Sequence, residues 1–267
     1  MKDGEDGWFN GYYDNHGRKV EGVMDESVRM MLTGQVFAIM SGTATEDQVE
    51  SICRSADKYL YDQKAGGYRL NTNFHEEKFD LGRMFGFAYG EKENGAVFSH
   101  MAVMYANALY KQGFIKEGYK VLKTLLDTAM DFDRSRMYPG VPEYFDNDGR
   151  GLYSYLTGAA SWYMLTMITS VFGVHGELGD LVIEPALMPQ QYNEKGDAKV
   201  SLEFAGHGFD ILVHNPDKLE PGDAHVKRAL CDDVKVENVT GNSVRIPKHV
   251  IEMLSTDKCH TVEIYIE

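Results

Sequence analysis

The residues that could do chemistry together lie in two short segments. Glu93, Asn94 and Gly95 are followed at His100 by an imidazole, so a carboxylate and an imidazole flank an Asn-Gly turn. Further along, the pair Thr157-Gly158 opens an apolar helical segment. A helix N-terminus offers unpaired backbone N–H groups and the positive end of a dipole, which suit a phosphate. The two segments together predict a site for a sugar and an anion.

Each of these residues also has an ordinary structural interpretation. A histidine near a helix start can be a hydrogen-bonded core residue, and Glu93 can be a solvated loop carboxylate. Thr157 suits a simple helix cap, since threonine is a preferred capping residue. Capping and phosphate binding can coexist, so the sequence alone leaves these alternatives open.

Composition and charge exclude several classes of function. The chain has 267 residues, 43% of them hydrophobic, which is typical of a globular protein. Its net charge of −14 argues against a nucleic acid or an anionic membrane as a partner. The three cysteines, Cys53, Cys231 and Cys259, have no metal-site spacing, and the histidines are scattered, so no metal is expected. A polar N-terminus without a long apolar run predicts a soluble, cytoplasmic protein.

The hydrophobic pattern changes near residue 180. Before it, apolar residues recur with helical spacing, and Thr45 with Gln48 forms a capping-box signature. After it, short apolar runs alternate with turns, and Thr240-Gly241-Asn242 predicts a hairpin. We therefore expect an α-helical domain over residues 1–179 and a β-strand region over 180–267. The predicted helices cover 26–40, 45–61, 97–112, 114–130 and 158–172, and the strands 181–184, 198–204, 209–214, 234–239, 243–246 and 260–266.

Five blocks in a fixed order carry a family resemblance. They are Asp6-Gly7-Trp8-Phe9 with Tyr12-Tyr13-Asp14, the stretch from Glu93 to His100, Pro142-Glu143-Tyr144, the stretch from Tyr155 to Trp162, and Leu181-Val182-Ile183-Glu184-Pro185. Their order resembles the C-terminal part of glycoside hydrolase family 94, the phosphorylases of cellobiose, cellodextrins, chitobiose and β-1,2-oligoglucans. The resemblance implies an α+β, mainly α fold: the second half of an (α/α)₆ barrel of the six-hairpin glycosidase type, followed by a small antiparallel β region.

The resemblance also implies roles for single residues. His100, Thr157 and Gly158 match the positions that hold phosphate in the family, and Glu93 matches a glutamate that binds sugar hydroxyls. Glu143 and Tyr144 could line the sugar pocket, Gln35 lies on a segment like one that faces the site, and Trp8 could stack on a sugar. Inorganic phosphate is the implied co-substrate, with no cofactor and no metal. For Glu143, Tyr144, Gln35 and Trp8, ordinary packing is the alternative.

The implied activity is that of an inverting glycoside phosphorylase, which cleaves β-linked di- or oligosaccharides with phosphate to give a sugar 1-phosphate. The family's general acid is an aspartate in a Trp-Asn-Asp-Gly-like motif, and this sequence has no such motif. We therefore expect the chain to lack the acid and to be inactive alone. The expected partners are a saccharide, phosphate, and either a separate N-terminal half or further copies of the chain. The alternative is a non-catalytic remnant that binds carbohydrate or phosphate.

Overall fold

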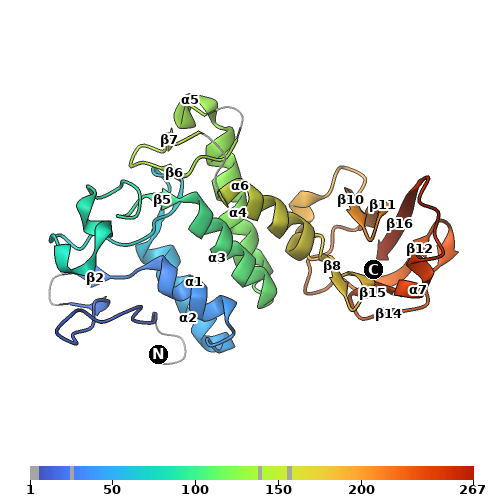
Figure 1. The fold of residues 1–267 in the computed structure, drawn as a ribbon, viewed down its shortest axis with the longest axis horizontal. Coiled ribbons are helices and arrows are strands. Elements are labelled where there is room, and N and C mark those ends of the chain that lie inside the picture. Colours follow the sequence, from blue (N-terminus) through green and yellow to red (C-terminus); the bar gives the residue numbers. More distant parts are fainter. Residues whose placement is uncertain (1–5, 25–26, 138–139, 155–157) are drawn as a thin grey trace. The chain divides into compact units, whose positions relative to one another are not determined.

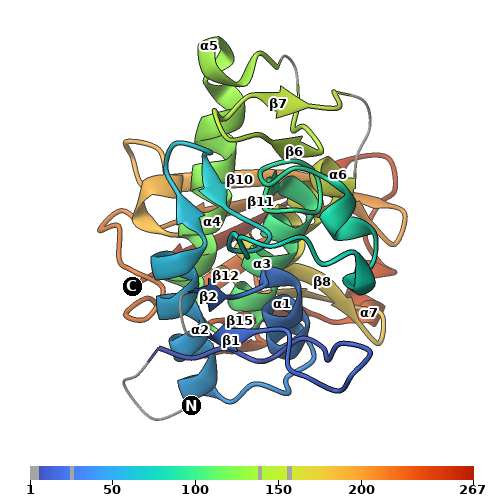
Figure 2. The ribbon, with the colours of Figure 1, turned by 90° about the vertical axis from the view of Figure 1, so that its left-hand side faces the viewer.

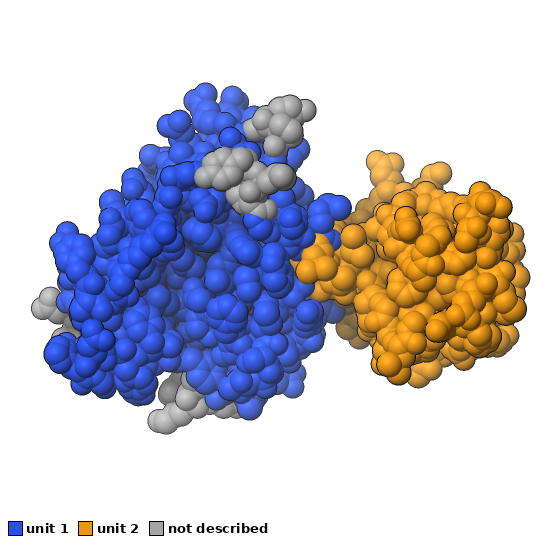
Figure 3. Space-filling model, in the orientation of Figure 1, with its two compact units in different colours: residues 1–164 blue, residues 165–267 orange. Residues whose placement is uncertain are grey.

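The structure is a computed structural model that describes residues 6–24, 27–137, 140–154 and 158–267. It divides into two compact units, residues 1–164 and 165–267, which Figure 3 shows in different colours. Most helices lie in the first unit and the larger sheets in the second, so the predicted α+β class is confirmed. The half-barrel and the domain division after residue 179 stay predictions. None of the described helices is long and apolar enough to cross a membrane.

The core of the first unit is a set of helices around α3 (Figure 1). Helix α3 packs against α1 and α4, and it joins α4 through Gly113, whose left-handed backbone (φ 82°) ends α3. Helix α4 is amphipathic and buries Val121, Leu122 and Leu125. The helices are α1 (Leu32–Met40), α2 (Glu46–Tyr59), α3 (Ser99–Lys111), α4 (Ile115–Met130), α5 (Phe132–Ser135) and α6 (Gly158–Thr166).

The first predicted helix begins later than expected. Residues 28 and 29 form a strand, β2 (Val28–Arg29), which pairs with β1 (Gly22–Val23). The next residues are tied to an extended segment, because Met30 O accepts from Thr72 N at 3.0 Å and Leu32 N donates to Leu70 O at 2.8 Å. These bonds hold the backbone extended until α1 starts. The capping box of α2 is confirmed, with Thr45 N donating to Gln48 Oε1 at 3.0 Å.

Short strands in the first unit bring distant loops together. Strands β3 (Tyr61–Asp62) and β4 (Gly67–Tyr68) form a hairpin, and 3₁₀ turns cover Phe79–Leu81 and Arg83–Gly86. A three-stranded sheet joins β5 (Val97–Phe98), β6 (Tyr144–Phe145) and β7 (Gly151–Leu152) in that order. This sheet places the loop before α3 beside the segment around Glu143. Its strands β6 and β7 lie side by side in Figure 2.

The second unit contains two sheets. The prediction that the strands of this region are antiparallel is wrong for one pair, because β11 and β16 run parallel. After β11 the chain passes through β12–β15 and α7 before it returns beside β11, and such a crossover permits a parallel pair. The five-stranded sheet has the order β10 (Asp197–Phe204), β11 (His207–His214), β16 (Cys259–Ile266), β12 (Val226–Cys231), β13 (Val234–Lys235). The four-stranded sheet has the order β14 (Val239–Thr240), β15 (Ser243–Ile246), β9 (Asp180–Ile183), β8 (Val174–Glu177).

Period-two burial explains these strands. In β11, Phe209, Ile211 and Val213 are fully buried while their neighbours are partly exposed, and β16 buries Val262 and Ile264 in the same way. The predicted hairpin at Gly241 is confirmed by the pairing of β14 with β15. The remaining short elements are a π-helical turn at Met167–Val171, a 3₁₀ turn at Pro189–Gln191 and α7 (Lys248–Ile251).

Candidate phosphate and sugar site

Glu93 lies in the middle of a tight turn. Asn94 N donates to Glu91 O at 3.0 Å, and Lys92 adopts a left-handed backbone (φ 45°) that is unusual for a residue with a side chain. The Oε1 atom of Glu93 lies 3.4 Å from the Arg83 guanidinium. Its Oε2 atom is buried and has no hydrogen-bond partner among the residues that the structure describes. The turn therefore holds a carboxylate with one oxygen left to accept hydrogen bonds.

The two residues after Glu93 are locked by the protein interior. Asn94 donates to Phe87 O at 2.8 Å and accepts from Asn71, while Gly95 N donates to the Asn71 side chain at 2.8 Å. Gly95 has φ 76°, and a Cβ here would overlap the Tyr89 ring. Glycine is thus required both by the backbone and by the close approach of an aromatic ring. The Asn-Gly turn expected from the sequence is a rigid part of the structure.

His100 lies in the first turn of α3, directly after β5. Its ring is half-buried, and Nε2 is buried without a partner in the described part of the chain. Burial lowers the pKa of His100 below its ordinary value of 6.5, because the charged form loses hydration. The ring is therefore neutral near pH 7. The neighbouring Ser99 hydroxyl is also buried and unpartnered within the described ranges, whereas Ser99 N donates to Glu143 O at 2.9 Å.

Gly158 lies directly against the His100 ring. A Cβ at Gly158 would come within 2.7 Å of Cε1 and 2.8 Å of Nδ1 of that ring. The ring of Trp162, one turn further along α6, lies 5.9 Å from the His100 ring at 48°. The structure thus brings together two of the three residues predicted to hold phosphate. The third, Thr157, lies outside the described residues.

Glu143 and Tyr144 reach the same region through β6. Phe98 pairs with Tyr144 across the small sheet, and Glu143 O accepts the hydrogen bond from Ser99 N. Tyr144 is 4% exposed, and its ring lies 6.0 Å from the ring of Tyr153. Burial raises the pKa of the Tyr144 phenol, so it remains neutral. Both residues therefore lie beside the start of α3.

Lys92 and Tyr153 were not singled out from the sequence as site residues. Lys92 Nζ lies 4.2 Å from the centre of the Tyr153 ring. The hydrogen bond to Tyr153 and the nearby charge of Glu143 raise the pKa of Lys92. Tyr153 has φ 62°, so two residues in left-handed backbone face each other here. The one sequence feature that could have marked Lys92 as a site residue is its position next to Glu93. Its pairing with Tyr153 depends on the fold.

Trp8 and Gln35 lie in a second cluster. Gln35 is fully buried, and its amide exchanges two hydrogen bonds with the Phe9 backbone at 2.8 and 2.9 Å and donates a third to Met31 O. Trp8 Nε1 donates to Arg29 O at 3.0 Å. The contacts recorded for the described chain link neither residue to His100 or Glu93. Their side chains thus anchor the N-terminal segment, and their role in binding stays a prediction.

Trp8 also lines a cavity of about 530 Å³. Glu21 lies in the same cavity, where its two oxygens accept from Gly11 N at 2.6 Å and Met31 N at 2.7 Å. Burial raises the pKa of Glu21 to about 7, although these two N–H groups work in the opposite direction. Asn10 also lines this cavity, and its Nδ2 atom is buried without a partner in the described structure. Sequence reasoning missed Glu21, since no motif marks it.

The arrangement can bind an anion and a hydroxyl group. A ring nitrogen, the first turn of α3 and the bare backbone at Gly158 can approach an anion, and the Glu93 carboxylate can accept from sugar hydroxyls. The described residues include no group of three or more His, Cys, Asp or Glu side chains that could hold a metal ion.

Comparisons with known proteins give a consistent family. Residues 2–173 match the family model described as the catalytic domain of the glycosyl hydrolase 94 superfamily. Cellobionic acid phosphorylase of Neurospora crassa is 28% identical over 76% of this chain, and N,N'-diacetylchitobiose phosphorylase of Vibrio proteolyticus is 26% identical over 82%. Solabiose phosphorylase of Paenibacillus borealis is 23% identical over 96%. The matched regions are 28%, 28% and 32% of these relatives, so the chain spans less than a third of their length.

Proposed function

Because the chain belongs to the glycosyl hydrolase 94 superfamily, we propose that it is the C-terminal portion of an inverting glycoside phosphorylase. The substrate is a β-linked di- or oligosaccharide, and the products are a sugar 1-phosphate and a shortened sugar. In this reaction phosphate forms a bond to the anomeric carbon with inversion, and the glycosidic oxygen leaves with a proton from a general acid. This chain supplies the phosphate and sugar side of that site.

The observation that carries the proposal is the packing of His100 against Gly158. A side chain at residue 158 would occupy the space beside the imidazole, and Nε2 of that imidazole is buried with no partner in the described ranges. A neutral imidazole can donate one hydrogen bond to a phosphate oxygen. Thr157 would add its hydroxyl and backbone N–H. Positioning of phosphate against the anomeric carbon supplies a large part of such catalysis, on the order of 7–11 kcal/mol at most.

The sugar side is assigned to Glu93, Glu143 and Tyr144. The unpartnered Oε2 of Glu93 suits a sugar hydroxyl, and β6 holds Glu143 and Tyr144 next to the start of α3. Trp8, with the cavity of about 530 Å³ that it lines, is the candidate for a second sugar contact. Gln35 acts on this part of the site by fixing the backbone next to Trp8.

The general acid is the missing component. The family motif that carries it is absent from this sequence, so the proposal requires an N-terminal half with the rest of an (α/α)₆ barrel. That half is either a separate chain or an upstream part of the same protein. A non-catalytic remnant that binds carbohydrate or phosphate is the second candidate. The unpartnered Oε2 of Glu93 and Nε2 of His100 support binding without any acid.

The two tryptophans allow a direct test of phosphate binding. Trp162 lies next to His100, whereas Trp8 lies in the other cluster, so W8F leaves fluorescence from Trp162 alone. We expect inorganic phosphate to change the fluorescence of W8F saturably and to leave W8F/H100A unchanged. The converse variant, W162F, retains only Trp8 and should respond less. A W8F protein that shows no His100-dependent response to phosphate would contradict the phosphate site.

Activity then separates the two candidate functions. The chain is incubated with phosphate and cellobiose, cellodextrins, β-1,2-glucans or chitobiose, with and without a family N-terminal half. Release of a sugar 1-phosphate only with the added half would support the phosphorylase portion. Binding of phosphate without restored release would favour the remnant. Release by the isolated chain would show that a proton donor is present in it.

A further inference from the structure

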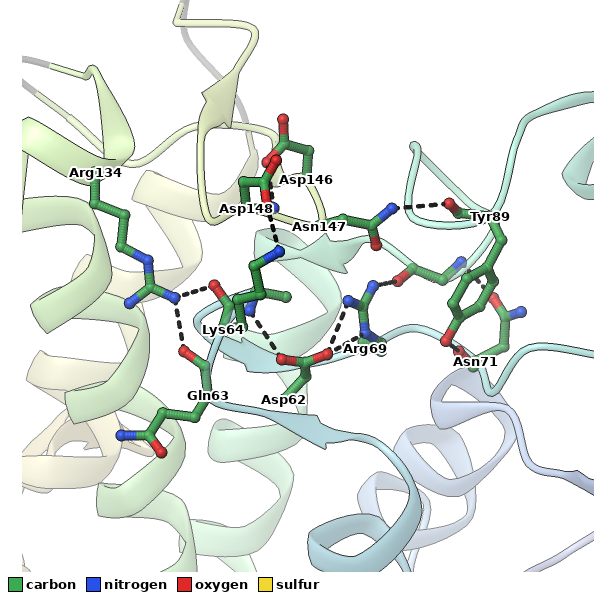
Figure 4. A network of polar contacts seen from close by, with 12 residues as sticks. Asp62, Gln63, Lys64, Arg69, Asn71, Tyr89, Arg134, Asp146, Asn147 and Asp148 are labelled. Carbon is green, nitrogen blue, oxygen red and sulfur yellow. Dashed lines mark hydrogen bonds and ion pairs between the residues drawn. The ribbon is translucent and has the colours of Figure 1, made fainter.

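We propose that Arg69 and Asn71 are positioning residues that fix the Glu93 turn and, through Gly95, the strand that leads to His100. Both residues lie on the segment that follows β4, and both side chains bond to Gly95. Figure 4 shows the Arg69 and Asn71 side chains. We call Arg69 and Asn71 together the clamp. Its purpose rests on the proposed roles of Glu93 and His100, whereas its geometry does not depend on them.

Arg69 holds the carbonyl of Gly95. Arg69 is 8% exposed, and its Nη1 donates to Gly95 O at 2.7 Å. Nε and Nη2 both donate to Asp62 Oδ2, at 3.0 and 2.8 Å. Burial works to raise the pKa of Asp62, but the Ala65 N–H and the Arg69 guanidinium outweigh it and hold the pKa below its ordinary value. The carboxylate therefore keeps its charge, and it orients the guanidinium toward Gly95.

Asn71 holds the other side of the same residue. It is fully buried, and Oδ1 accepts from Gly95 N at 2.8 Å. Its Nδ2 donates to Asn94 Oδ1 at 3.2 Å and to Thr72 O at 3.0 Å. The N–H and the C=O of Gly95 are thus each bonded to a different buried side chain. A glycine in left-handed backbone is otherwise free to adopt many conformations, so two such bonds fix the turn at its most flexible residue.

Neighbouring loops reinforce the clamp. The Tyr89 hydroxyl donates to Asn71 O at 3.2 Å, and its ring covers the Arg69 guanidinium at 5.4 Å. Asn147, in the turn between β6 and β7, donates to Tyr89 O at 3.1 Å. Figure 4 shows this chain of contacts running from Asn147 through Tyr89 to Asn71 and Arg69. The clamp therefore joins the loop that carries Glu93 to the sheet that carries Glu143 and Tyr144.

The clamp acts where the backbone is under strain. Lys92 has φ 45° and precedes Glu93, so the turn would relax if its anchor were removed. Gly95 is followed at once by Ala96 and β5, whose end is the start of α3. A shift of Gly95 would therefore move Glu93 directly and His100 through β5. Small displacements of such groups weaken binding and catalysis without unfolding the protein.

The test uses two variants and one matched control. R69K keeps the charge next to Asp62, but a single ammonium cannot reproduce the fork that reaches both Asp62 and Gly95 O. N71A removes the acceptor of Gly95 N. R245K makes the same substitution in the second unit, where Arg245 pairs with Asp180 at 3.0 Å and with Glu177. Folding of each variant is checked by circular dichroism, and N71S replaces N71A if the latter does not fold.

We expect both clamp variants to speed hydrogen exchange of Gly95 N–H about tenfold or more, as loss of a buried hydrogen bond implies. The NMR signals of the His100 ring should shift, and in the W8F background the affinity for phosphate should fall about tenfold. R245K should change none of these. Unchanged Gly95 exchange and His100 signals in folded R69K and N71A would overturn the clamp. If the parent chain shows no response to phosphate, the proposed function fails. Hydrogen exchange of Gly95 N–H then still shows whether Arg69 and Asn71 fix the turn.

Discussion

Two histidines, one in each unit, differ in how their imidazole nitrogens are hydrogen-bonded. His260 in β16 is 1% exposed, and both ring nitrogens have partners: Nδ1 lies 2.7 Å from Asp232 Oδ2 and Nε2 lies 2.7 Å from Ser255 O. His100 at the start of α3 is half-buried, and its Nε2 has no partner among the described residues. The first histidine completes a hydrogen-bond network, and the second has an unused nitrogen.

The difference separates a structural histidine from a candidate binding one. Buried polar atoms are nearly always hydrogen-bonded, and an exception in a native protein calls for an explanation. Around His260, the Asp232 carboxylate also pairs with Lys258 at 2.6 Å and accepts from Thr261 N at 3.0 Å. The hydroxyl of Ser99, next to His100 in the chain, is also unpartnered among the described residues, and so is Glu93 Oε2 in the turn before β5. Two such atoms in the first turn of α3, on Ser99 and His100, suggest a place for a polar ligand.

The largest expected effect is on stability, from H260A. Removing this ring leaves a cavity and takes one hydrogen bond each from Asp232 Oδ2 and Ser255 O, which should destabilise the second unit by about 3 kcal/mol. Urea unfolding monitored by circular dichroism measures the change. H100A is the matched comparison, and it should cost less than about 1 kcal/mol because Nε2 makes no hydrogen bond to the described chain. Equal losses in the two variants would remove the distinction between these histidines.

A methyl group at residue 158 should test the site more finely. In G158A the new Cβ would lie 2.7 Å from the His100 ring, so the ring must move. Alanine in place of glycine in a helix gains about 0.5–1 kcal/mol, which offsets part of this overlap. We therefore expect near-normal stability and a loss of phosphate affinity of about tenfold or more, measured by Trp162 fluorescence. G222A, where the added methyl meets no atom within 4 Å, is the control.

The next effect is a change in the titration of His100. Burial lowers its pKa in the folded chain, so the unfolded chain takes up the proton more readily and this residue makes folding less favourable as pH falls below 6.5. A bound phosphate favours the charged ring and should raise the pKa by about one unit. A titration of the labelled His100 ring by NMR, with and without phosphate, measures both values. A pKa that phosphate leaves unchanged would contradict contact between them.

The sequence was sufficient for elements with a clear local signal. The capping box at Thr45 and Gln48, the amphipathic α4 and the hairpin at Gly241 follow from short patterns, and the structure contains all three. The start of α1 could not be predicted, since hydrogen bonds that join residues 30 and 32 to the distant residues 72 and 70 hold the backbone extended up to Met31. Likewise, the parallel pairing of β11 with β16 depends on where the chain returns after a long excursion.

In the candidate site, too, some features follow from the local sequence and others depend on contacts between distant residues. The sequence predicts that Gly158 lies next to an anion, which stays a prediction, and the structure sets Gly158 against the His100 ring. The roles of Arg69 and Asn71 could not be predicted, because their partner Gly95 lies more than twenty residues away in sequence. Gln35 illustrates the converse. Its sequence context suggested a ligand contact, but only the fold shows that its amide is fully bonded to the Phe9 and Met31 backbone.

The smallest expected effect concerns the surfaces of the two units. Met164, 62% exposed, lies on α6, whose sequence is apolar almost all round, and such a helix is normally covered. Met253 in the second unit is 74% exposed but follows α7 in a polar turn. If α6 contacts another copy or a missing half, M164S should weaken self-association by about 1 kcal/mol, whereas M253S should not. Sedimentation over a range of concentrations compares them, and an equal change in both variants would show that exposed methionine alone, not the face of α6, drives the association.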